Sequence, residues 1–299
     1  MNSKWRIGVD VGGTFTDVAI VNEEDGTMGV AKVSSTPEDF GVGVLKAIEQ
    51  AQKKYKIQSN DVSLLAHATT VVTNAILEEK GARVGLVSTL GFRDILELRR
   101  SARADLYDLF QDPPSVLVQR RNRFEITERI DAEGQVVIPI IEDEIEQLIS
   151  KLKTAQVEAV AVSLLFSFLN DKHEALVGRR LREALPNIPV FLSSEVLPEI
   201  REFERTSTTA ICAYVGPILS SYLARLKNSV TEKGLPTPYV MGSGGGLFEI
   251  EESLKMPAMA AESGPAAGVI AAALAGKQIN RSKLLSFDMG GTTAKASLI

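Results

Sequence analysis

The sequence predicts an α/β fold, and three observations support this. Two short apolar stretches, residues 7–11 and 15–21, flank a glycine pair, which is typical of a β-hairpin. A third strand is expected at 29–33, and the apolar spacing over 39–55 predicts an amphipathic helix. Residues 157–193 have the pattern of a strand–helix–strand unit in a parallel sheet. Strands and helices that alternate in this way indicate an α/β protein.

Further elements follow the same periodicities. Strands are expected at residues 64–70, 83–88, 159–165, 190–193, 239–242 and 284–288, and helices at residues 73–80, 142–153, 173–184, 202–222 and 266–275. Residues 91–135 are richer in charge and are interrupted by Pro113-Pro114, so we interpret them as an inserted, partly irregular region. Because residue 299 falls where a strand should still be running, we expect a longer polypeptide of which these residues are the front part.

Composition and charge narrow the classes of function. The chain has 299 residues, of which 44% are hydrophobic and 24% charged, as in soluble globular proteins. Its net charge of −5 argues against a nucleic-acid binder. The absence of any apolar run of about 18 residues argues against a membrane protein. Basic clusters at 99–103 and 120–123 are interpreted as a solvated face or a partner contact.

Cysteine and histidine are scarce. The single cysteine, Cys212, excludes an intramolecular disulfide, which fits a reducing, cytoplasmic location. It stands in an apolar stretch, so we interpret it as a packing residue rather than a nucleophile. Only His67 and His173 are present, which excludes a His-rich metal site.

Two distant segments of the chain resemble each other. The segment Asp10-Val-Gly-Gly-Thr-Phe-Thr-Asp-Val-Ala-Ile-Val21 aligns without gaps on Asp288-Met-Gly-Gly-Thr-Thr-Ala-Lys-Ala-Ser-Leu-Ile299. The aspartate, both glycines and the following threonine are identical in the two copies. Each copy also combines an apolar strand, a glycine turn and a second strand. We interpret the pair as a duplicated functional hairpin.

The residues of this hairpin suit a phosphate group. Glycines let the backbone approach a bulky anion, and their N–H groups form a small anion-binding nest with a threonine hydroxyl. An aspartate at the end of the first strand is placed to hold Mg²⁺ beside the phosphates. Two such hairpins would clamp a polyphosphate from both sides and stabilise transition-state charge. The alternative is a tight turn without a ligand, but the presence of a second copy of the motif favours the phosphate-binding interpretation.

The candidate site follows from this pair, and its predicted ligand is a nucleotide with magnesium. The catalytic candidates are Asp10, Asp17 and Asp288, of which Asp10 and Asp288 are also the expected metal ligands. The candidates for binding the phosphates are Gly12, Gly13, Thr14, Thr16, Gly290, Gly291, Thr292, Thr293 and Lys295. Other phosphate motifs fit less well, because G-x-x-x-x-G-K-[S/T] is absent and a strand rather than a helix follows the glycines.

Several segments together carry a resemblance to a known family. They are Asp10-Val-Gly-Gly-Thr-Phe-Thr-Asp17, His67-Ala-Thr-Thr-Val-Val-Thr-Asn-Ala75, Lys80-Gly-Ala-Arg-Val-Gly-Leu86, Gly91-Phe-Arg-Asp94, Glu195-Val-Leu-Pro-Glu199, Arg201-Glu-Phe-Glu-Arg-Thr-Ser-Thr-Thr209, Glu262-Ser-Gly-Pro-Ala-Ala-Gly268 and Phe287-Asp-Met-Gly-Gly-Thr-Thr293. Along nearly its whole length the sequence resembles the N-terminal portion of the hydantoinase A/5-oxoprolinase family, to which subunits of acetone and acetophenone carboxylases are related.

The resemblance implies an actin/hexokinase-like (ribonuclease H-like) ATPase fold, with a first lobe, an inserted α/β region and the start of a second lobe. Residues 1–90 would be the first ATPase-type lobe with the phosphate-1 hairpin, and residues 91–200 the inserted region. Residues 201–299 would hold the connecting helices and the start of the second lobe with the phosphate-2 hairpin. The segment 263–268 would begin the connecting helix, and the adenosine site would lie beyond residue 299.

The resemblance also implies the chemistry. The family, which includes N-methylhydantoinase and 5-oxoprolinase, opens cyclic amides with ATP and magnesium by phosphorylating the amide oxygen, so that water can attack the activated carbon. It implies a small cyclic amide substrate, a second hydantoinase B-type subunit and an oligomer. In the related carboxylases the same activation would make an enol phosphate from a ketone. Family members often end the second loop in Ser-Thr-Asp, whereas this sequence has Lys295, which either contacts a phosphate or is a surface residue.

Three further segments have both a functional and a structural interpretation. His67-Ala-Thr-Thr70 ends a strand, where active-site groups often lie, but a threonine there also serves as a helix N-cap. Residues 201–209 form either a substrate-facing wall or ion pairs along a helix. Ser243-Gly-Gly-Gly246 either approaches the nucleotide or simply turns.

Three functions therefore stay open. The first is a subunit or fragment of an ATP-dependent cyclic-amide hydrolase, inactive without the rest of the enzyme. The second is the ATP-binding subunit of an acetone/acetophenone-type carboxylase, and the third is a non-catalytic nucleotide-binding module. A simple small-molecule kinase shares the hairpins but not the intervening segments.

Overall fold

A computed structural model describes residues 4–36, 38–101, 105, 107–108, 110–111, 114–290 and 294–299. The chain divides into two compact units. Unit 1 comprises Met1–Leu77, Ile218–Leu254 and Met259–Ile299, and unit 2 comprises Glu78–Pro217 and Lys255–Ala258. The divisions after Leu77 and Pro217 differ from the divisions after residues 90 and 200 that the sequence suggested.

Unit 1 is built on a six-stranded sheet with the order β12-β11-β4-β1-β2-β3. Its strands are β1 (Trp5–Val11), β2 (Phe15–Asn22), β3 (Met28–Ser34), β4 (Val62–Thr69), β11 (Tyr239–Met241) and β12 (Leu247–Phe248). β2 runs antiparallel to both of its neighbours, whereas β4 is parallel to β1 and to β11. Strand β1 alternates buried and exposed positions, so its apolar side chains enter the core on one face.

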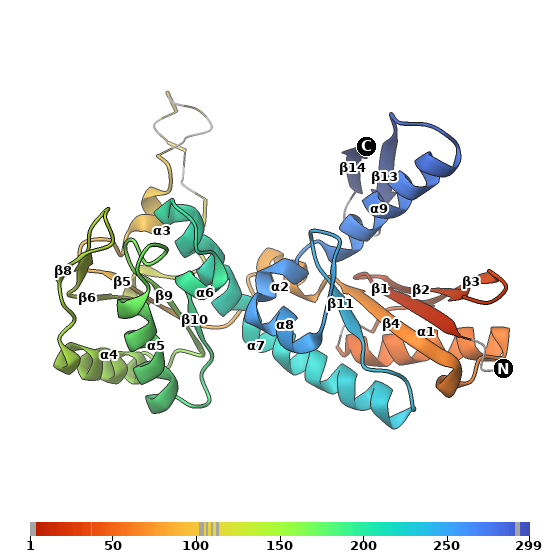
Figure 1. Cartoon of the computed structure of the whole chain (residues 1–299), viewed down its shortest axis with the longest axis horizontal. Helices are drawn as coiled ribbons and strands as arrows, with labels where there is room; N and C mark the ends of the chain where they lie inside the picture. Colours follow the sequence, from red (N-terminus) through yellow and green to blue (C-terminus); the bar gives the residue numbers. More distant parts are fainter. Residues whose placement is uncertain are drawn as a thin grey trace. The chain divides into compact units, whose positions relative to one another are not determined.

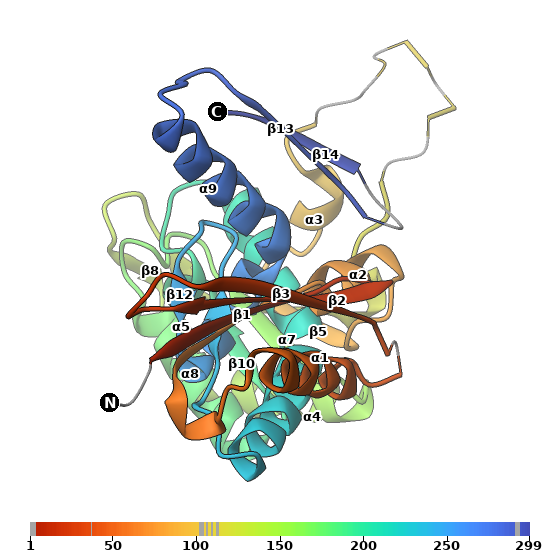
Figure 2. The ribbon, with the colours of Figure 1, turned by 90° about the vertical axis from the view of Figure 1, so that its right-hand side faces the viewer.

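Helices cover this sheet. They are α1 (Phe40–Tyr55), α2 (Val71–Leu77), α8 (Ile250–Lys255), α9 (Ser263–Gln278) and the second part of α7 (Glu202–Glu232), with the short turns η1 (Ser59–Asp61) and η3 (Pro257–Ala260) nearby. Helix α1 begins where the Asp39 carboxylate accepts a hydrogen bond from the Gly41 amide. It lies along β1, β2 and β3, and α9 starts from the other side of the sheet, over β4 (Figures 1 and 2).

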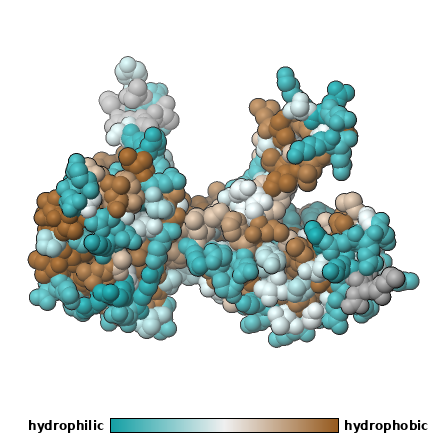
Figure 3. Space-filling model, in the orientation of Figure 1, coloured by the Kyte–Doolittle hydropathy of each residue, from teal (hydrophilic) through white to brown (hydrophobic). Residues whose placement is uncertain are grey.

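A second hairpin, β13 (Leu285–Met289) and β14 (Ala294–Leu298), follows α9. In it Asp288 pairs with Lys295, and in the first hairpin Asp10 pairs with Asp17. The two pairings occupy equivalent positions of the aligned segments, so the structure confirms the repeat. Apolar side chains gather on this hairpin and on α9 (Figure 3), where Phe287 is 66% exposed. Exposed apolar surface of this kind is typical of a face that packs against another polypeptide.

Unit 2 contains a parallel sheet with the order β10-β9-β5-β6. The strands are β5 (Val84–Thr89), β6 (Arg123–Ile126), β9 (Ala159–Ser163) and β10 (Val190–Leu192), and a small antiparallel pair is formed by β7 (Arg129–Ile130) and β8 (Val136–Ile138). Its helices are α3 (Ile95–Leu98), α4 (Glu142–Thr154), α5 (Lys172–Ala184), α6 (Ser193–Val196), the turn η2 (Arg120–Asn122) and the first part of α7. Apolar side chains of α4 and α5 pack against the sheet and form the core of this unit.

Most expected elements are present, and several differ in extent, helix α7 most of all. Helix α7 continues to Glu232, ten residues beyond the predicted end, with Pro217 at the boundary between the units. The region expected to be irregular, residues 91–135, contains α3 and β6, and β6 pairs with β5 in the four-stranded sheet of unit 2. The pattern of β6 was hidden because it is an edge strand whose Arg123 and Glu125 make polar contacts.

Candidate functional site

The candidate site lies in unit 1, where parallel strands end. Asp10 is the second-last residue of β1, and Thr69 is the last residue of β4. β11 is parallel to both and leads into the turn at Ser243, where the Gly242 amide donates to the Gly246 carbonyl at 2.9 Å. Ligands of open α/β sheets bind beyond the carboxyl ends of such strands.

The first hairpin leaves two backbone N–H groups available. The Gly12 amide closes the turn by donating to the Phe15 carbonyl at 2.9 Å. The amides of Gly13 and Thr14 donate to no other group in the part of the chain that the structure describes. A β-carbon on Gly13 would meet nothing within 4 Å, so this peptide faces open space. The arrangement therefore fits an anion that accepts hydrogen bonds from both amides.

Thr16 does not face this space. Its side chain is buried, and its hydroxyl lies 3.0 Å from the hydroxyl of Ser35. Ser35 in turn donates to the Gly12 carbonyl at 2.7 Å. Thr16 therefore fixes the shape of the hairpin from beneath, whereas the side chain of Thr14 is exposed.

Asp10 has an unusual electrostatic environment. Desolvation by nearby protein atoms raises the pKa of its carboxyl from 3.8 to about 6, although the residue is exposed to solvent. The carboxylates of Asp17 and Asp288 raise this pKa further, while Lys32 and Lys295 oppose them. A carboxylate held among other carboxylates is a group that a cation would stabilise.

The start of α9 is fixed against the same strand ends. The buried Ser263 hydroxyl accepts from the Thr69 amide at 3.1 Å and donates to the Thr69 carbonyl at 3.2 Å. Gly264 comes next, and a β-carbon there would lie 2.7 Å from Oδ1 of Asp10. The missing side chain thus gives room to the Asp10 carboxylate.

The equivalent position of the two hairpins forms an ion pair in each, but it is the acidic partner in the first hairpin and the basic partner in the second. In the first, Asp17 is exposed and pairs with Lys32 of β3 at 2.8 Å. In the second, Lys295 pairs with Glu262, the residue before α9. Asp288 and Gly290 are exposed, and the predicted ligands Gly291, Thr292 and Thr293 lie outside the described residues.

The residues present fit a magnesium ion only together with phosphates. Among the described residues, no three His, Cys, Asp or Glu side chains gather into a metal-binding group. Magnesium typically keeps several waters and takes one or two carboxylates plus phosphate oxygens. Asp10 and Asp288 are the two carboxylates that the sequence suggested for this role, and the charge of Asp288 influences the pKa of Asp10.

His67 and Thr69 have structural roles in this unit. Nε2 of buried His67 lies 2.8 Å from the Tyr222 hydroxyl, and burial lowers the His67 pKa to about 4, so the ring is neutral at pH 7. The Thr69 hydroxyl accepts from the Val71 amide at 3.2 Å, so it satisfies an N–H group at the start of α2. Thr70 directly precedes α2, but its hydroxyl donates to the Val11 carbonyl at 3.1 Å, so neither threonine is a standard N-cap.

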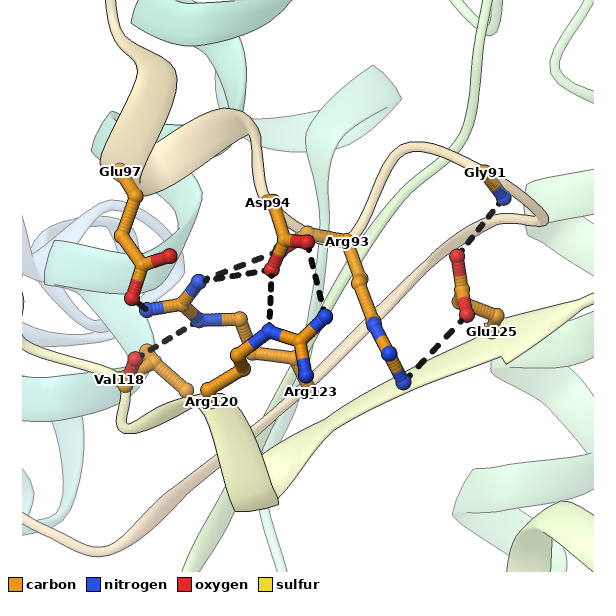
Figure 4. A network of polar contacts seen from close by, with 8 residues as sticks. All are labelled: Gly91, Arg93, Asp94, Glu97, Val118, Arg120, Arg123 and Glu125. Atoms are coloured by element: carbon orange, nitrogen blue, oxygen red, sulfur yellow. Dashed lines mark hydrogen bonds and ion pairs between the residues drawn. The ribbon is translucent and has the colours of Figure 1, made fainter.

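The basic cluster at 120–123 belongs to an internal network of unit 2 (Figure 4). Arg123 is fully buried and contacts the carboxylates of Asp94 and Glu97. Arg120 binds Asp94 through two nitrogen atoms, at 3.0 and 3.1 Å. Asp94 thus joins the segment after β5 to the segment before β6. Buried Arg123 is therefore structural, whereas Arg120 and Arg121 are exposed, as the interpretation as a solvated face expects.

The polar segment at the start of α7 also packs internally. Arg205 is buried and donates to the carbonyls of Leu164 and Glu199. Glu204 pairs with Arg100 rather than with an arginine on its own helix. Cys212 is buried as predicted, and burial raises the pKa of its thiol to about 11.

Four residues of the site were not singled out from the sequence, namely Lys32, Ser35, Glu262 and Gly264. Lys32 and Ser35 are ordinary residues of a strand end, and only the sheet register brings them to the hairpin. Gly264 had a signal, because it stands in the small-residue segment at 263–268. Its contact with Asp10 depends on tertiary packing.

Comparison with known proteins completes the description. Residues 6–185 match the hydantoinase/oxoprolinase N-terminal region, and residues 205–299 match the hydantoinase/oxoprolinase domain. An uncharacterized protein of Methanocaldococcus jannaschii is 42% identical over 99% of this chain and 43% of its own length. Caprolactamase subunit alpha of Pseudomonas jessenii is 34% identical, over 99% of this chain and 43% of its own. Acetophenone carboxylase gamma subunit of Aromatoleum aromaticum is 30% identical, over 98% of this chain and 42% of its own length.

Two solved structures are also similar. The nucleotide-free structure of acetone carboxylase has a TM-score of 0.90 at 27% identity, over 99% of this chain and 44% of that chain. The ATP-dependent caprolactamase of Pseudomonas jessenii has a TM-score of 0.88 at 33% identity, over 98% of this chain and 43% of that chain. The chain thus has the α/β fold of these proteins and spans less than half the length of the relatives it matches. No helix in the described residues is long and apolar enough to cross a membrane. With both family regions matched over most of its length, this chain belongs to the hydantoinase/oxoprolinase family.

Proposed function

We propose that this chain provides the phosphate-binding part of an ATP-dependent cyclic-amide hydrolase. The observation that supports this most directly is the pair of hairpins with equivalent registers, Asp10 with Asp17 and Asp288 with Lys295. Burial raises the pKa of Asp10, and the charges of Asp17 and of the second strand-end aspartate, Asp288, raise it further. The free amides of Gly13 and Thr14 lie beside them. Such a site suits a polyphosphate and its magnesium ion.

The proposed fold assignment is the actin/hexokinase-like one. The antiparallel strands β1, β2 and β3 continue into the parallel strands β4 and β11, with α1 along one face. The repeated hairpin then follows α9, in the place expected for the start of a second lobe. The β13–β14 hairpin forms a sheet of its own in the described part of the chain.

In this proposal Asp10 and Asp288 hold magnesium, and Gly12, Gly13 and Thr14 bind phosphate oxygens. ATP would supply a phosphoryl group to the amide oxygen, which would activate the amide carbon towards water, so that the ring C–N bond breaks and ADP and phosphate are released. The chain's own residues then orient the phosphates and balance their charge, which is the main requirement of phosphoryl transfer. Lys295 is close enough to influence the pKa of Asp10. We propose that it contacts a phosphate once it leaves Glu262.

A carboxylase function is the second candidate, and a specific observation favours it. Relatives named as subunits of acetophenone and acetone carboxylases match the chain over 98% of its length. The same phosphoryl transfer to a ketone oxygen would then give an enol phosphate for carboxylation. Both functions use the hairpins in the same way, so the substrate separates them.

We further propose that the chain works in the cytoplasm with a second subunit of the hydantoinase B type. Several relatives carry the word subunit in their names, including caprolactamase subunit alpha. The exposed apolar side chains on α9 and the second hairpin provide surface on which another polypeptide could pack.

The test is an ATP hydrolysis assay on the complete protein with its partner subunit. Hydantoin, 5-oxoproline and lactams form one set of substrates, and ketones with bicarbonate form the other. Stimulation by the cyclic amides supports the hydrolase. Stimulation only by ketone with bicarbonate establishes the carboxylase instead, and ATP binding without any turnover would leave a nucleotide-binding module.

A further inference from the structure

A polar pocket of about 410 Å³ lies in unit 2, at the amino ends of β5 and β9 and beside α7. Its wall includes Arg83, Arg121, Asn122, Glu158 and Tyr214. We call it the Tyr214 pocket. Pockets that hold small molecules have volumes of about 300–1,000 Å³, so this one has room for a ligand. All of its residues belong to unit 2, whereas the proposed phosphate-binding residues belong to unit 1.

Two buried polar side chains reach this pocket without a partner. Tyr214 is 6% exposed and Asn122 is 8% exposed, and neither the hydroxyl nor the side-chain amide has a hydrogen-bond partner among the described residues. In that part of the chain, the unpartnered side-chain atoms that lack accessible surface are Nδ1 of His67 and Nε of Arg99. The Tyr214 hydroxyl and the Asn122 amide are therefore accessible, and both residues line the pocket. Buried polar side chains normally have partners, which a polar ligand in the pocket would supply.

The Tyr214 ring is held in place by the segment before β5. A β-carbon on Gly81 would lie 2.0 Å from Cε1 of the ring, so the missing side chain gives the ring its room. The Ala82 amide donates to the Tyr214 carbonyl at 2.8 Å, which ties this segment to α7. A side chain that is fixed before a ligand arrives loses little freedom on binding. The hydroxyl is thus already positioned for a ligand.

The pocket also has two charged side chains of each sign. The guanidinium groups of Arg83 and Arg121 form no ion pair or hydrogen bond with the described residues. The Glu158 carboxylate accepts from the Arg83 backbone amide at 2.7 Å, and Glu79 accepts from the Ser115 hydroxyl at 3.3 Å, so neither carboxylate is neutralised by a cation. A ligand with one charge would be attracted by two of these groups and repelled by the other two. A ligand with both charges can be attracted by all four.

We propose that the Tyr214 pocket binds a free amino acid, with its carboxylate held by Arg83 and Arg121 and its ammonium group by the carboxylates of Glu79 and Glu158. A guanidinium binds a carboxylate through two parallel N–H groups, which makes arginine well suited to this task. The Tyr214 hydroxyl then gains the partner that it lacks. A cavity of about 150 Å³ holds benzene, so the larger pocket has room for an amino acid of the size of glutamate together with ordered water.

This ligand class is chemically related to the proposed reaction. Hydrolysis of the C–N bond of a lactam gives a molecule with one new carboxylate and one new amine. The Tyr214 pocket would therefore take the product of ring opening at a place of its own. The choice of amino acids as probes rests in this respect on the proposed function, whereas the charges and the unpartnered groups of the pocket do not.

The first experiment separates the two charges of the ligand. Glutamate, 5-aminopentanoate and 6-aminohexanoate, the products of opening 5-oxoproline, 2-piperidinone and ε-caprolactam, are titrated into the complete protein by calorimetry without nucleotide. Glutarate, hexanoate and hexylamine are the matched probes that lack either the ammonium or a carboxylate group. We expect saturable binding of an amino acid, and an affinity about tenfold or more lower for its matched probes. The inference is overturned if no amino acid binds saturably, or if the matched probes bind as tightly.

Variants then place the binding in the pocket. Tyr214→Phe removes only the hydroxyl and keeps the ring against Gly81, and Arg121→Gln removes one guanidinium. Arg179→Gln is the matched control, because Arg179 is an exposed arginine of α5 that does not line the pocket. We expect the affinity for the amino acid to fall about tenfold in Arg121→Gln and about fivefold in Tyr214→Phe, and to stay within about twofold in the control. Unchanged affinity in both pocket variants would overturn the inference.

Failure of this inference is separable from failure of the proposed function. Mg-ATP and the amino acid are titrated separately into the wild-type protein and into Asp10→Ala. Absence of ATP binding in the wild type would defeat the proposed function, while amino-acid binding that depends on Tyr214 and Arg121 would still establish the site. ATP binding that depends on Asp10, without amino-acid binding, would defeat only the inference. Asp10→Ala should bind the amino acid as the wild type does, because Asp10 belongs to unit 1.

Discussion

Oδ1 of Asp10 lies 2.7 Å from the point that a β-carbon on Gly264 would occupy. This contact joins the end of β1 to the first turn of α9, which Ser263 fixes on the end of β4. The glycine is therefore required by space and not by an unusual backbone angle. Because a real β-carbon almost never comes this close, any side chain here must move the carboxylate or the helix.

Gly264→Ala should therefore impair nucleotide chemistry without unfolding the protein. We expect Mg-ATP turnover by the complete enzyme to fall about tenfold or more, because shifts of about 1 Å in catalytic groups are costly. Gly268→Ala is the matched control on the same helix, since its β-carbon would meet nothing within 4 Å. That control should keep full turnover and gain up to about 1 kcal/mol of stability. Equal turnover in the two variants would contradict the role given to Gly264.

Asp10 should make the folded state less stable near neutral pH. Its folded pKa of about 6 exceeds the unfolded value of 3.8, so stability falls as the pH rises between these values. Asp10→Asn removes the charge and should raise the free energy of unfolding at pH 7 by about 1 kcal/mol, after allowance for solvent screening. The gain should disappear below about pH 4, where the wild-type carboxyl is protonated in both states. Urea denaturation at pH 4 and pH 7 measures this, and a wild type more stable than the variant at pH 7 would refute it.

The same variant should not turn over Mg-ATP, because an amide replaces the proposed metal ligand. In the wild type, nucleotide binding that depends on magnesium should weaken as the pH falls through about 6, where Asp10 becomes protonated. The measurement is a magnesium-dependent ATP titration between pH 5 and pH 8. Asp25→Asn, on the exposed turn between β2 and β3, is the control and should bind ATP as the wild type does.

The hairpins could be predicted because their signals are local. The glycine pair and the apolar strands beside it are visible within a dozen residues in each copy, and the two hairpins form with equivalent registers. Helix α1 was predicted to within one residue for the same reason, since its apolar spacing and its Asp39 cap are sequence features.

The electrostatic part of the site could not be predicted in this way. Burial is the main cause that raises the pKa of Asp10, and it comes from tertiary packing; a smaller contribution comes from Asp288, which lies 278 positions later in the chain. The direction of Thr16 was also hidden, because a threonine beside glycines suits a phosphate ligand as well as a hydroxyl turned towards Ser35. The register of β2 with β3 decides between these.

His67 should make unit 1 sensitive to acid. Its folded pKa of about 4 lies below the reference value of 6.5, so the unfolded state takes up a proton first as the pH falls. The difference corresponds to about 3 kcal/mol of stability lost between pH 6.5 and pH 4. His67→Gln should not show this loss of unfolding free energy between pH 6.5 and pH 4, whatever its stability at pH 7. Tyr222→Phe should show the same loss while being about 1 kcal/mol less stable at pH 7, because His67 Nε2 is left without its partner. Identical slopes in the wild type and His67→Gln, measured by urea denaturation, would show that His67 is not buried as a neutral ring.

The Asp94 network should stabilise unit 2 more than its exposed ion pairs do. Asp94→Asn leaves the guanidinium of buried Arg123 with Glu97 as its remaining carboxylate partner, at 3.1 Å. We expect the free energy of unfolding at pH 7 to fall by about 2 kcal/mol, because the buried Arg123 charge then lacks one of its two carboxylate partners. Glu195→Gln, which breaks the exposed pair with Arg182, should cost less than about 0.5 kcal/mol.

The pH dependence provides a further check on this variant. The hydrogen bond from Arg120 lowers the Asp94 pKa below 3.8, so the wild type keeps its advantage above that value. The advantage should narrow only as the pH falls through the lowered pKa, where Asp94 becomes protonated in the folded state. A gap that closes well above pH 4 would mean that the carboxylate charge is not what holds Arg120 and Arg123. The two segments would then be joined by packing alone.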